Sequence, residues 1–371
     1  MNEEQIDTTL QDSTDKLLRP GLIVSERTIS EYSMFLHHLL VGLADESIPV
    51  VLICPPGVDV EPVVSPAIEV VRHPAIDLPF LWSQNRKILI EHLEKFKPTV
   101  LHCLCESKAV LTRQLARQMD LPYVLTVDSL QKRWGCLSIS SKRCAKIMVP
   151  AESIAENLSR IYPKFAPRIE KINIGTFVSE TSVCFHNPSQ LASMVTAGPI
   201  DKLEEFENLL SAVRHLAIDG YEFLLVVMSE GRIEKKLRRL IGALGLSQIV
   251  NIIPILNPRL SVLAAGDIFI QAQPCDFFNT LLLEAMSVGA AVAACKGGVD
   301  DLIIEDKTAV VFDPNDELSI MSSLQRLFDR REFARKLAIE TQEYLRENHG
   351  VSNMISSVLQ SYHDAQDWFK K

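Results

Sequence analysis

The stretch Gln273-Pro-Cys-Asp-Phe-Phe-Asn-Thr-Leu-Leu-Leu-Glu-Ala-Met-Ser-Val-Gly289 decides the fold of this chain. It follows an apolar run and predicts a turn and then a helix over residues 280–287, because Asn279 is a favourable N-cap residue. Gly289 stands just beyond the last predicted helical residue, where glycine commonly ends a helix. A strand, a turn and a helix in this order are typical of an α/β unit with a parallel sheet.

The start of this predicted helix is a candidate site for an anion. Backbone N–H groups near Thr280 lack helical partners, and the helix dipole adds a partial positive charge there. Glu284 lies one turn further on, and helical side chains lean toward the N-terminus, so its carboxylate is directed back to the same place. Asp276 lies in the preceding loop. The alternative is an ordinary capped helix that carries a surface glutamate.

Short apolar runs alternate with helical patterns on both sides of this stretch. Such alternation predicts parallel sheets that are covered by helices on both faces. In the first half the predicted strands are residues 21–25, 50–54, 68–72, 100–103, 123–126 and 146–149. After a polar connection, the strands predicted in the second half are residues 192–196, 223–228, 249–255, 268–271, 291–295 and 309–312.

The polar connection predicts an α/β protein with two doubly wound parallel-sheet domains, residues 20–188 and residues 189–352. Residues 1–19 are polar and predict a disordered tail, and residues 353–371 form a last helical pattern. Ligands of doubly wound sheets bind beyond the carboxyl ends of the strands. We therefore expect the binding site in a cleft between the two domains.

Composition excludes several classes of function. Lysine and arginine number 38 against 47 acidic residues, a net charge of −9, which argues against nucleic acid as a partner because phosphate backbones bind basic surfaces. No apolar run reaches the ~20 residues that span a bilayer, and the N-terminus lacks a signal-peptide core, so a cytoplasmic protein is predicted. The eight cysteines lack metal-ligand spacing and predict buried free thiols and no metal.

Three linked motifs resemble the retaining glycosyltransferase family 4, also called glycosyl transferases group 1. The pair Asp276 and Glu284, separated by seven residues and leading into Leu-Glu-Ala-Met, is similar to that family's two glutamates. Residues 296–301, Lys-Gly-Gly-Val-Asp-Asp, stand where the family has Gly-Gly-x-x-Glu. Residues 305–314 look like its Asp-Gly-x-x-Gly-Leu-Val-x-Pro ending.

Weaker similarities extend the resemblance over residues 20–370. Ser229-Glu-Gly231 stands where the family has Gly-x-Gly against the nucleotide, and the last helical pattern resembles the helix that crosses back to the first domain. The resemblance implies a GT-B fold, in which two Rossmann-like domains face each other across a cleft. It also implies transfer of a sugar from a nucleotide-diphosphate sugar, with retention, to an unidentified glycan, lipid or small molecule.

The resemblance also assigns roles to residues. Glu284 would accept hydrogen bonds from the ribose hydroxyls, the amides near Asn279 and Thr280 would hold the diphosphate, and Asp276 would hold hydroxyls of the donor sugar. The further nucleotide-sugar-binding residues that it implies are Gly231, Lys296, Gly297 and Gly298. No metal and no cofactor are expected, because helix amides and basic side chains carry the charge of the leaving diphosphate.

The sequence departs from the family at residues that bear on catalysis. Pro199 and Glu204 stand where the family has an arginine and a lysine that face the diphosphate. Lys202 and Lys296 are candidates to compensate, although surface lysines would look the same. The family's Thr-x-His becomes Thr126-Val-Asp128. Asp128 is either a base, a group that binds the acceptor hydroxyls, or a plain turn residue.

Two functional interpretations remain. One is an active retaining hexosyltransferase with an altered donor site. The other is a catalytically inactive GT-B protein that binds nucleotide or serves as a scaffold for another glycosyltransferase; unrelated uses of the fold, such as an epimerase or a phosphorylase, form a third class. The lost cations favour the inactive protein, whereas Glu284 and the two glycines favour ligand binding. The basic stretch at residues 234–239 is by default a solvated helix face, which leaves peripheral membrane contact open.

Overall fold

The computed structural model describes residues 17–370, except residues 62, 65–67, 74–81, 133, 134, 136, 188, 199–202, 230–232 and 256–258. The chain divides into two compact units. Unit 1 holds the described residues up to Pro150, together with Leu158–Ile172 and the chain from Ser352 onward; unit 2 holds Ala151–Asn157 and Asn173–Val351. Most of the predicted tail lies outside the described residues, but Leu18 is already buried.

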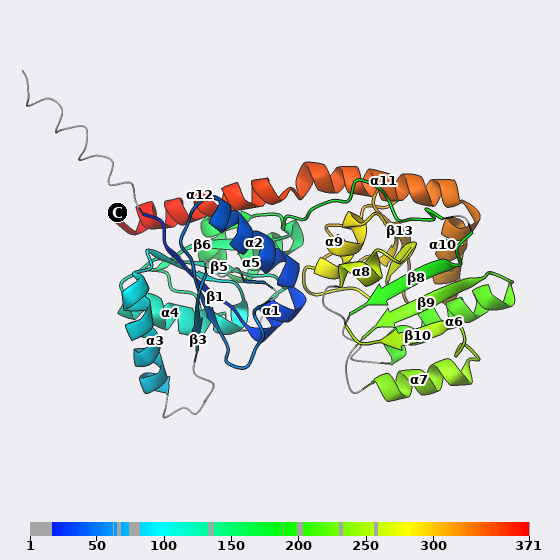
Figure 1. Ribbon diagram of the computed structural model, residues 1–371, viewed down its shortest axis with the longest axis horizontal. Helices are drawn as coiled ribbons and strands as arrows, with labels where there is room; N and C mark the ends of the chain where they lie inside the picture. Colours follow the sequence, from blue (N-terminus) through cyan, green and yellow to red (C-terminus); the bar gives the residue numbers. More distant parts are fainter. Residues whose placement is uncertain are drawn as a thin grey trace, which may run out of the picture. The chain divides into compact units, whose positions relative to one another are not determined.

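Unit 1 contains a seven-stranded sheet in the order β3-β2-β1-β4-β5-β6-β7 (Figure 1). Every pair of neighbouring strands is parallel. The strands are β1 Pro20–Ile23, β2 Val51–Cys54, β3 Glu69–Arg72, β4 Val100–Cys103, β5 Tyr123–Thr126, β6 Cys144–Val149 and β7 Ile169–Lys171. All residues of β1, β2 and β4 are buried, as expected for inner strands of a parallel sheet covered on both faces.

Several connections of this sheet are helical. They are α1 Glu26–Glu31, α2 Ser33–Asp45, α3 Trp82–Phe96, α4 Ala109–Gln118 and α5 Glu152–Ile161, with short 3-10 turns η2 Glu106–Lys108 and η3 Pro163–Arg168. The apolar spacing of residues 29–43 predicts a single helix, but the structure has the pair α1 and α2, which are separated at Tyr32. Helix α1 begins before the predicted start because Ser25 and Thr28 form a capping box.

The last helix, α12 Val351–Lys370, belongs to unit 1 from Ser352 onward (red in Figure 1). The hydroxyl of Tyr362 lies 2.7 Å from Nδ1 of His102 on β4, and Nε2 of the same ring lies 2.8 Å from Oγ1 of Thr126 on β5. Burial lowers the pKa of His102 to about 3, so the imidazole is neutral. This buried chain of hydrogen bonds fixes α12 to the centre of the sheet.

Unit 2 contains a six-stranded parallel sheet in the order β10-β9-β8-β11-β12-β13. The strands are β8 Ala192–Ala197, β9 Phe223–Met228, β10 Val250–Ile253, β11 Ile268–Gln271, β12 Ala291–Cys295 and β13 Val310–Phe312. The helices are α6 Glu204–Ile218, α7 Glu234–Ala243, α8 Leu260–Leu263, α9 Thr280–Ser287, α10 Glu317–Asp329 and α11 Arg331–Asn348. Strands β11 and β12 are buried throughout.

The predicted fold class is confirmed, because the described chain forms two parallel-sheet α/β units. The prediction lacked β7 and α8, which are both short. The seven described cysteines are free and all but Cys275 are buried, in agreement with the prediction; Cys136 lies outside the described residues. Among the helices that the structure describes, none has the length and hydropathy to cross a membrane.

The bond between Tyr362 and His102 gives the first prediction. Tyr362→Phe leaves a buried imidazole nitrogen without its partner, and we expect the free energy of unfolding of unit 1 to fall by about 1–3 kcal/mol. Urea denaturation at neutral pH measures this loss. His363→Ala, at an exposed position of the same helix, is the matched control and should leave the midpoint nearly unchanged. Equal midpoints for the two variants would contradict the role given to this bond.

Candidate functional site

The N-terminus of α9 is built by Asn279. Its backbone is extended, and its Oδ1 accepts a hydrogen bond of 3.2 Å from the backbone N–H of Leu282. Its Nδ2 donates to Oε1 of Gln271 at 2.9 Å, so the last residue of β11 holds the cap in place. The N-cap and the helix bounds predicted from the sequence are both observed. Every residue of α9 is buried, including Thr280.

The glycine turn after β12 packs against the loop that leads into α9. Gly297 and Gly298 have φ values of +117° and +70°, which side chains rarely adopt. A Cβ atom added at Gly298 would lie 2.1 Å from the carbonyl oxygen of Cys275. The backbone N–H of Val299 donates to that same oxygen at 2.6 Å. The turn therefore requires glycine, and it fixes the loop next to the start of α9.

Glu284 is the most unusual residue of this site. Its side chain is 4% exposed, and neither carboxylate oxygen accepts a hydrogen bond from a described residue. Oε1 lies 3.5 Å from Nη2 of Arg259, whose side chain is also buried. Burial raises the pKa of Glu284, and the positive charge of Arg259 opposes this shift. A buried carboxylate that lacks hydrogen-bond donors is costly, and a ligand with hydroxyl groups would remove the cost.

Sequence analysis did not identify Arg259 or Gln271. Arg259 immediately precedes α8, in a stretch with no strong helical pattern, and arginine is seldom buried. Gln271 ends the apolar run of β11, and its Nε2 is buried without a hydrogen-bond partner among the described residues. Gln271 could have been identified from the sequence, because it is a polar residue at the carboxyl end of an apolar strand.

The other predicted site residues of unit 2 are exposed, or lie outside the described residues. Asp276 is exposed in the loop before α9. Lys296 is half exposed, and its Nζ lies 3.6 Å from a carboxylate oxygen of Glu305, so its role at a diphosphate gains no support and stays a prediction. The predicted residues Gly231, Pro199 and Lys202 lie outside the described residues, as does the side chain of Glu204.

Asp301 stands where the family has the glutamate of its Gly-Gly-x-x-Glu turn. Its carboxylate accepts hydrogen bonds from the backbone N–H groups of Glu152 and Ser153 and from the hydroxyl of Ser153. These contacts cap the first turn of α5. The Asp301 carboxylate therefore accepts hydrogen bonds from the start of α5, and it is not among the candidate ligand-binding residues.

Unit 1 places Asp128 beside two charged residues at the carboxyl ends of its strands. Asp128 follows β5, is 6% exposed, and has an Oδ1 atom 3.7 Å from Nη1 of Arg27. The backbone N–H of Asp128 donates to Oε1 of Glu106 at 3.1 Å. Burial and the nearby Glu106 carboxylate raise the pKa of Asp128 to about 7, against the effect of Arg27. Such a carboxyl group can take up or release a proton near neutral pH.

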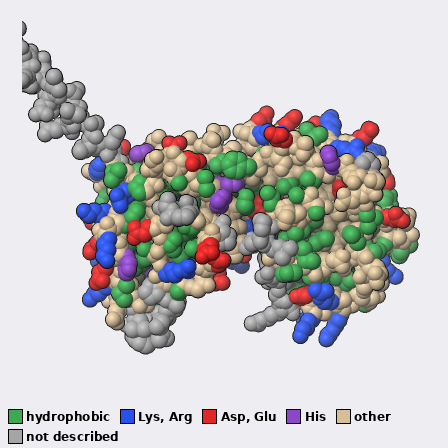
Figure 2. Space-filling view, viewed as in Figure 1, with side chains coloured by type: hydrophobic (Ala, Val, Ile, Leu, Met, Phe, Trp, Pro, Cys, Tyr) green, Lys and Arg blue, Asp and Glu red, His purple; other side chains and the backbone are tan. Residues whose placement is uncertain are grey.

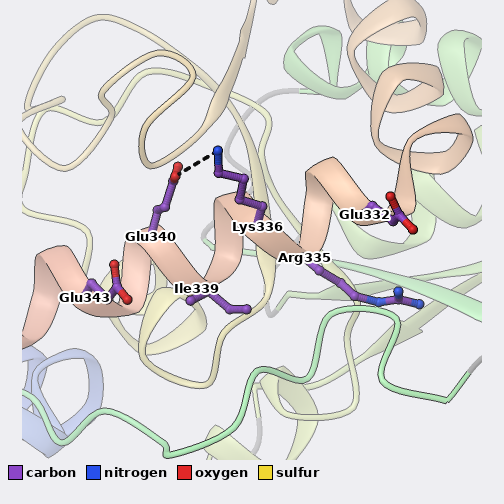
Figure 3. Close-up of a pocket in the computed structure, with 6 residues that line it drawn as sticks. All are labelled: Glu332, Arg335, Lys336, Ile339, Glu340 and Glu343. Atoms are coloured by element: carbon purple, nitrogen blue, oxygen red, sulfur yellow. Dashed lines mark ion pairs between the residues drawn. The ribbon is translucent and has the colours of Figure 1, made fainter.

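Two surface features lie apart from these residues. Figure 2 shows basic side chains over α7, where Lys235, Lys236 and Arg239 are exposed, which agrees with a solvated helix face. An open depression of about 450 Å³ lies along α11, and Figure 3 draws the residues that line it. Lys336 and Glu340 form an ion pair of 3.5 Å there. None of the six residues that line this depression is a predicted site residue.

Comparison with known proteins relates the chain to glycosyltransferases. The model of the family described as glycosyl transferases group 1 matches residues 187–344, which lie within unit 2. Sulfoquinovosyl transferase SQD2 of Arabidopsis thaliana is 21% identical over 270 residues, which is 66% of this chain. The chain spans about half of that relative, because the match covers 52% of its length.

Solved structures show the fold. A glycosyltransferase from Rickettsia africae has a TM-score of 0.78 at 15% identity, over 94% of this chain and 99% of that chain. HepE of Anabaena, solved with UDP and glucose, has a TM-score of 0.76 at 11% identity, over 93% of this chain and 99% of its own. Sucrose-phosphate synthase of Thermosynechococcus elongatus has a TM-score of 0.78 at 15% identity, over 95% and 100%. The fold is GT-B, and these findings together support a GT-B glycosyltransferase.

The environment of Asp128 predicts a dependence of stability on pH. The pKa of Asp128 is raised in the folded protein from an ordinary value of 3.8 to about 7, so the folded state binds the extra proton between these values. The stability that protonated Asp128 contributes to the wild-type protein is therefore lost as the pH rises through 7. Asp128→Asn removes the titration, and we expect the variant to gain about 1–3 kcal/mol relative to wild type between pH 5 and pH 8.

Urea denaturation at several pH values measures the difference between Asp128→Asn and wild type. Glu91→Gln, which changes an exposed carboxylate on α3, is the control and should show no such trend. A difference that stays constant from pH 5 to pH 8 would show that Asp128 does not titrate in this range.

Proposed function

We propose that this chain is a GT-B glycosyltransferase that binds a nucleotide-diphosphate sugar at the start of α9 and at Glu284. One observation carries the proposal: Glu284 is buried, and both of its carboxylate oxygens lack hydrogen-bond donors among the described residues. The two vicinal hydroxyls of a ribose supply two donors at the right spacing for one carboxylate. Hydrogen bonds to a charged group are the strong ones, so this contact would contribute much of the affinity.

The diphosphate of the donor fits the neighbouring features. The N-terminus of α9 carries about half a positive charge, which attracts phosphate oxygens. The amide Nε2 of Gln271, buried beside the cap of this helix, lacks a partner among the described residues and is one more donor. The glycine turn at Gly298 packs against the backbone of Cys275 and so holds the loop beside the start of this helix.

The reaction proposed is sugar transfer with retention of the anomeric configuration. The bond from the anomeric carbon to the diphosphate oxygen breaks, and a bond from that carbon to an acceptor oxygen forms. Asp276, exposed in the loop before α9, would hold hydroxyls of the donor sugar. Asp128 would receive the proton of the acceptor hydroxyl or hold that hydroxyl by a hydrogen bond, because its pKa of about 7 suits either task.

A second candidate function is nucleotide binding without transfer, in partnership with another glycosyltransferase. The observation that favours it concerns charge. Pro199 and Glu204 stand at the family's two cationic positions, and Lys296 is paired with Glu305. A leaving diphosphate gains negative charge as the sugar departs, and each missing preorganised donor costs about 10²- to 10³-fold in rate.

Nucleotide binding is tested with uridine, guanosine and adenosine diphosphates in a thermal-shift screen, followed by calorimetric titration. A diphosphate that binds should raise the melting temperature, because a ligand of the folded state stabilises it. Glu284→Gln keeps the shape of the side chain but removes its charge, and we expect affinity to fall about 10- to 100-fold. Glu343→Gln, an exposed change on α11, is the control. Equal affinity for Glu284→Gln and wild type would remove Glu284 from the site.

Transfer is tested by restoring the missing charges. The double variant Pro199→Arg with Glu204→Lys should raise the rate of donor hydrolysis by at least about 10²-fold, because two cations again face the diphosphate. The double variant Pro199→Ala with Glu204→Gln separates the effect of positive charge from that of the altered loop. Equal rates for both double variants would favour the protein that binds nucleotide without transferring sugar.

A further inference from the structure

Arg259 and Glu284 form a buried ion pair in unit 2. Their side chains are 3% and 4% exposed, and the distance from Nη2 of Arg259 to Oε1 of Glu284 is 3.5 Å. Removal of each ion from water costs several kcal/mol, so a buried charge persists only beside an opposite charge or in hydrogen bonds. At 3.5 Å the two opposite charges still attract each other. The distance is longer than an ordinary hydrogen bond between a guanidinium group and a carboxylate. The lone pairs of Glu284 therefore remain open to other donors.

Helices α8 and α11 and strands β11 and β12 pack against α9. On α11, Arg335 donates to the carbonyl oxygen of Phe185 and Arg346 to that of Ser179. On β12, burial raises the pKa of Cys295 to about 12, so this thiol is neutral. The charge that acts on Glu284 is therefore that of Arg259, as the direction of the effect on its pKa shows.

We infer that Arg259 is a positioning residue for nucleotide binding, which holds the Glu284 carboxylate charged and fixed so that both of its oxygens can receive ribose hydroxyls. The inference rests on the proposed function of Glu284. A guanidinium group suits this task, because it stays protonated when it is buried and its planar fork holds a carboxylate in one orientation. Arg259 acts through Glu284, and no contact between Arg259 and the nucleotide is required.

A purely structural ion pair would behave differently. If Arg259 only contributed to stability, its loss would weaken nucleotide binding equally at all pH values or not at all. If Arg259 keeps Glu284 ionised, its loss allows Glu284 to become protonated at neutral pH, because burial already raises the pKa of that carboxyl. A protonated carboxyl loses its charge and part of its capacity as an acceptor. The affinity should then depend on pH in the variant and not in the wild type.

The experiment is calorimetric titration of full-length wild type, Arg259→Met and Arg259→Lys with uridine diphosphate from pH 6.0 to pH 8.5, or with whichever of the guanosine and adenosine diphosphates binds better. The quantity compared is the ratio of the variant's Kd to the wild-type Kd at the same pH, which cancels titration of the nucleotide. For Arg259→Met we expect a ratio of at least about 10 at pH 6.0 that falls toward unity at pH 8.5. For Arg259→Lys, which keeps the charge, the ratio should be small and constant.

A ratio for Arg259→Met that stays at unity, or that is raised equally at every pH, would overturn the inference. If this variant does not fold, titration of wild type at pH 7.5 in two buffers of different ionisation enthalpy decides the question. The nucleotide is then fully ionised, since its last phosphate pKa is about 6. We expect binding to release less than about a tenth of a proton, and release of about half a proton or more would show that Glu284 is neutral in the free protein.

The same measurements separate this inference from the function on which it rests. Absence of binding by all three diphosphates to wild type would defeat the proposed function and the role of Arg259 together. Tight binding by wild type, weak binding by Glu284→Gln and unchanged, pH-independent binding by Arg259→Met would defeat the role of Arg259 alone.

Discussion

The strands of both sheets are parallel and mostly buried, and this constraint decides where the chain can place reactive groups. A parallel sheet covered on both faces has no polar face, so polar side chains leave it only beyond the ends of its strands. The residues of chemical interest lie at those ends. Asp128 follows β5, Gln271 ends β11, and the glycine turn follows β12. Asn279 and Glu284 belong to α9, the helix that comes after β11, and their positions depend on the same sheet.

The sequence predicted the elements whose signals are local. The predicted bounds of β9, β11, β12 and α9 agree with the structure, because each is a short apolar run or a capped helix bounded by turn residues. The elements that it missed depend on distant partners. Strand β7 has only three residues and one apolar side chain, and its pairing with β6 defines it. The break at Tyr32 was hidden because the apolar spacing continues from α1 into α2.

The candidate site was predictable only in part, for the same reason. The N-cap Asn279 was predictable because its role follows from its position within one strand–turn–helix segment. Glu284 and Gly298 were named as site residues chiefly from the resemblance to the glycosyltransferase family. Arg259 was not found, since burial of an arginine is decided by a partner on another element, and sequence rules place arginine at the surface. The raised pKa of Asp128 likewise arises from burial and from the carboxylate of Glu106, which belongs to η2. Lys296 directly follows β12, whose end was predicted, but its pairing with Glu305 is a tertiary contact that the sequence does not show.

The charge balance of unit 2 separates recognition from transfer. Arg259 and Glu284 together are neutral, so the pair can hold a ribose without adding positive charge for a leaving diphosphate. The N-terminus of α9 adds only about half a charge. The arginine and lysine of the family would add two, and this chain has Pro199 and Glu204 at those positions. Under the proposed function, nucleotide affinity and transfer rate would depend on different residues, and strong binding of a nucleoside diphosphate would not by itself establish catalysis.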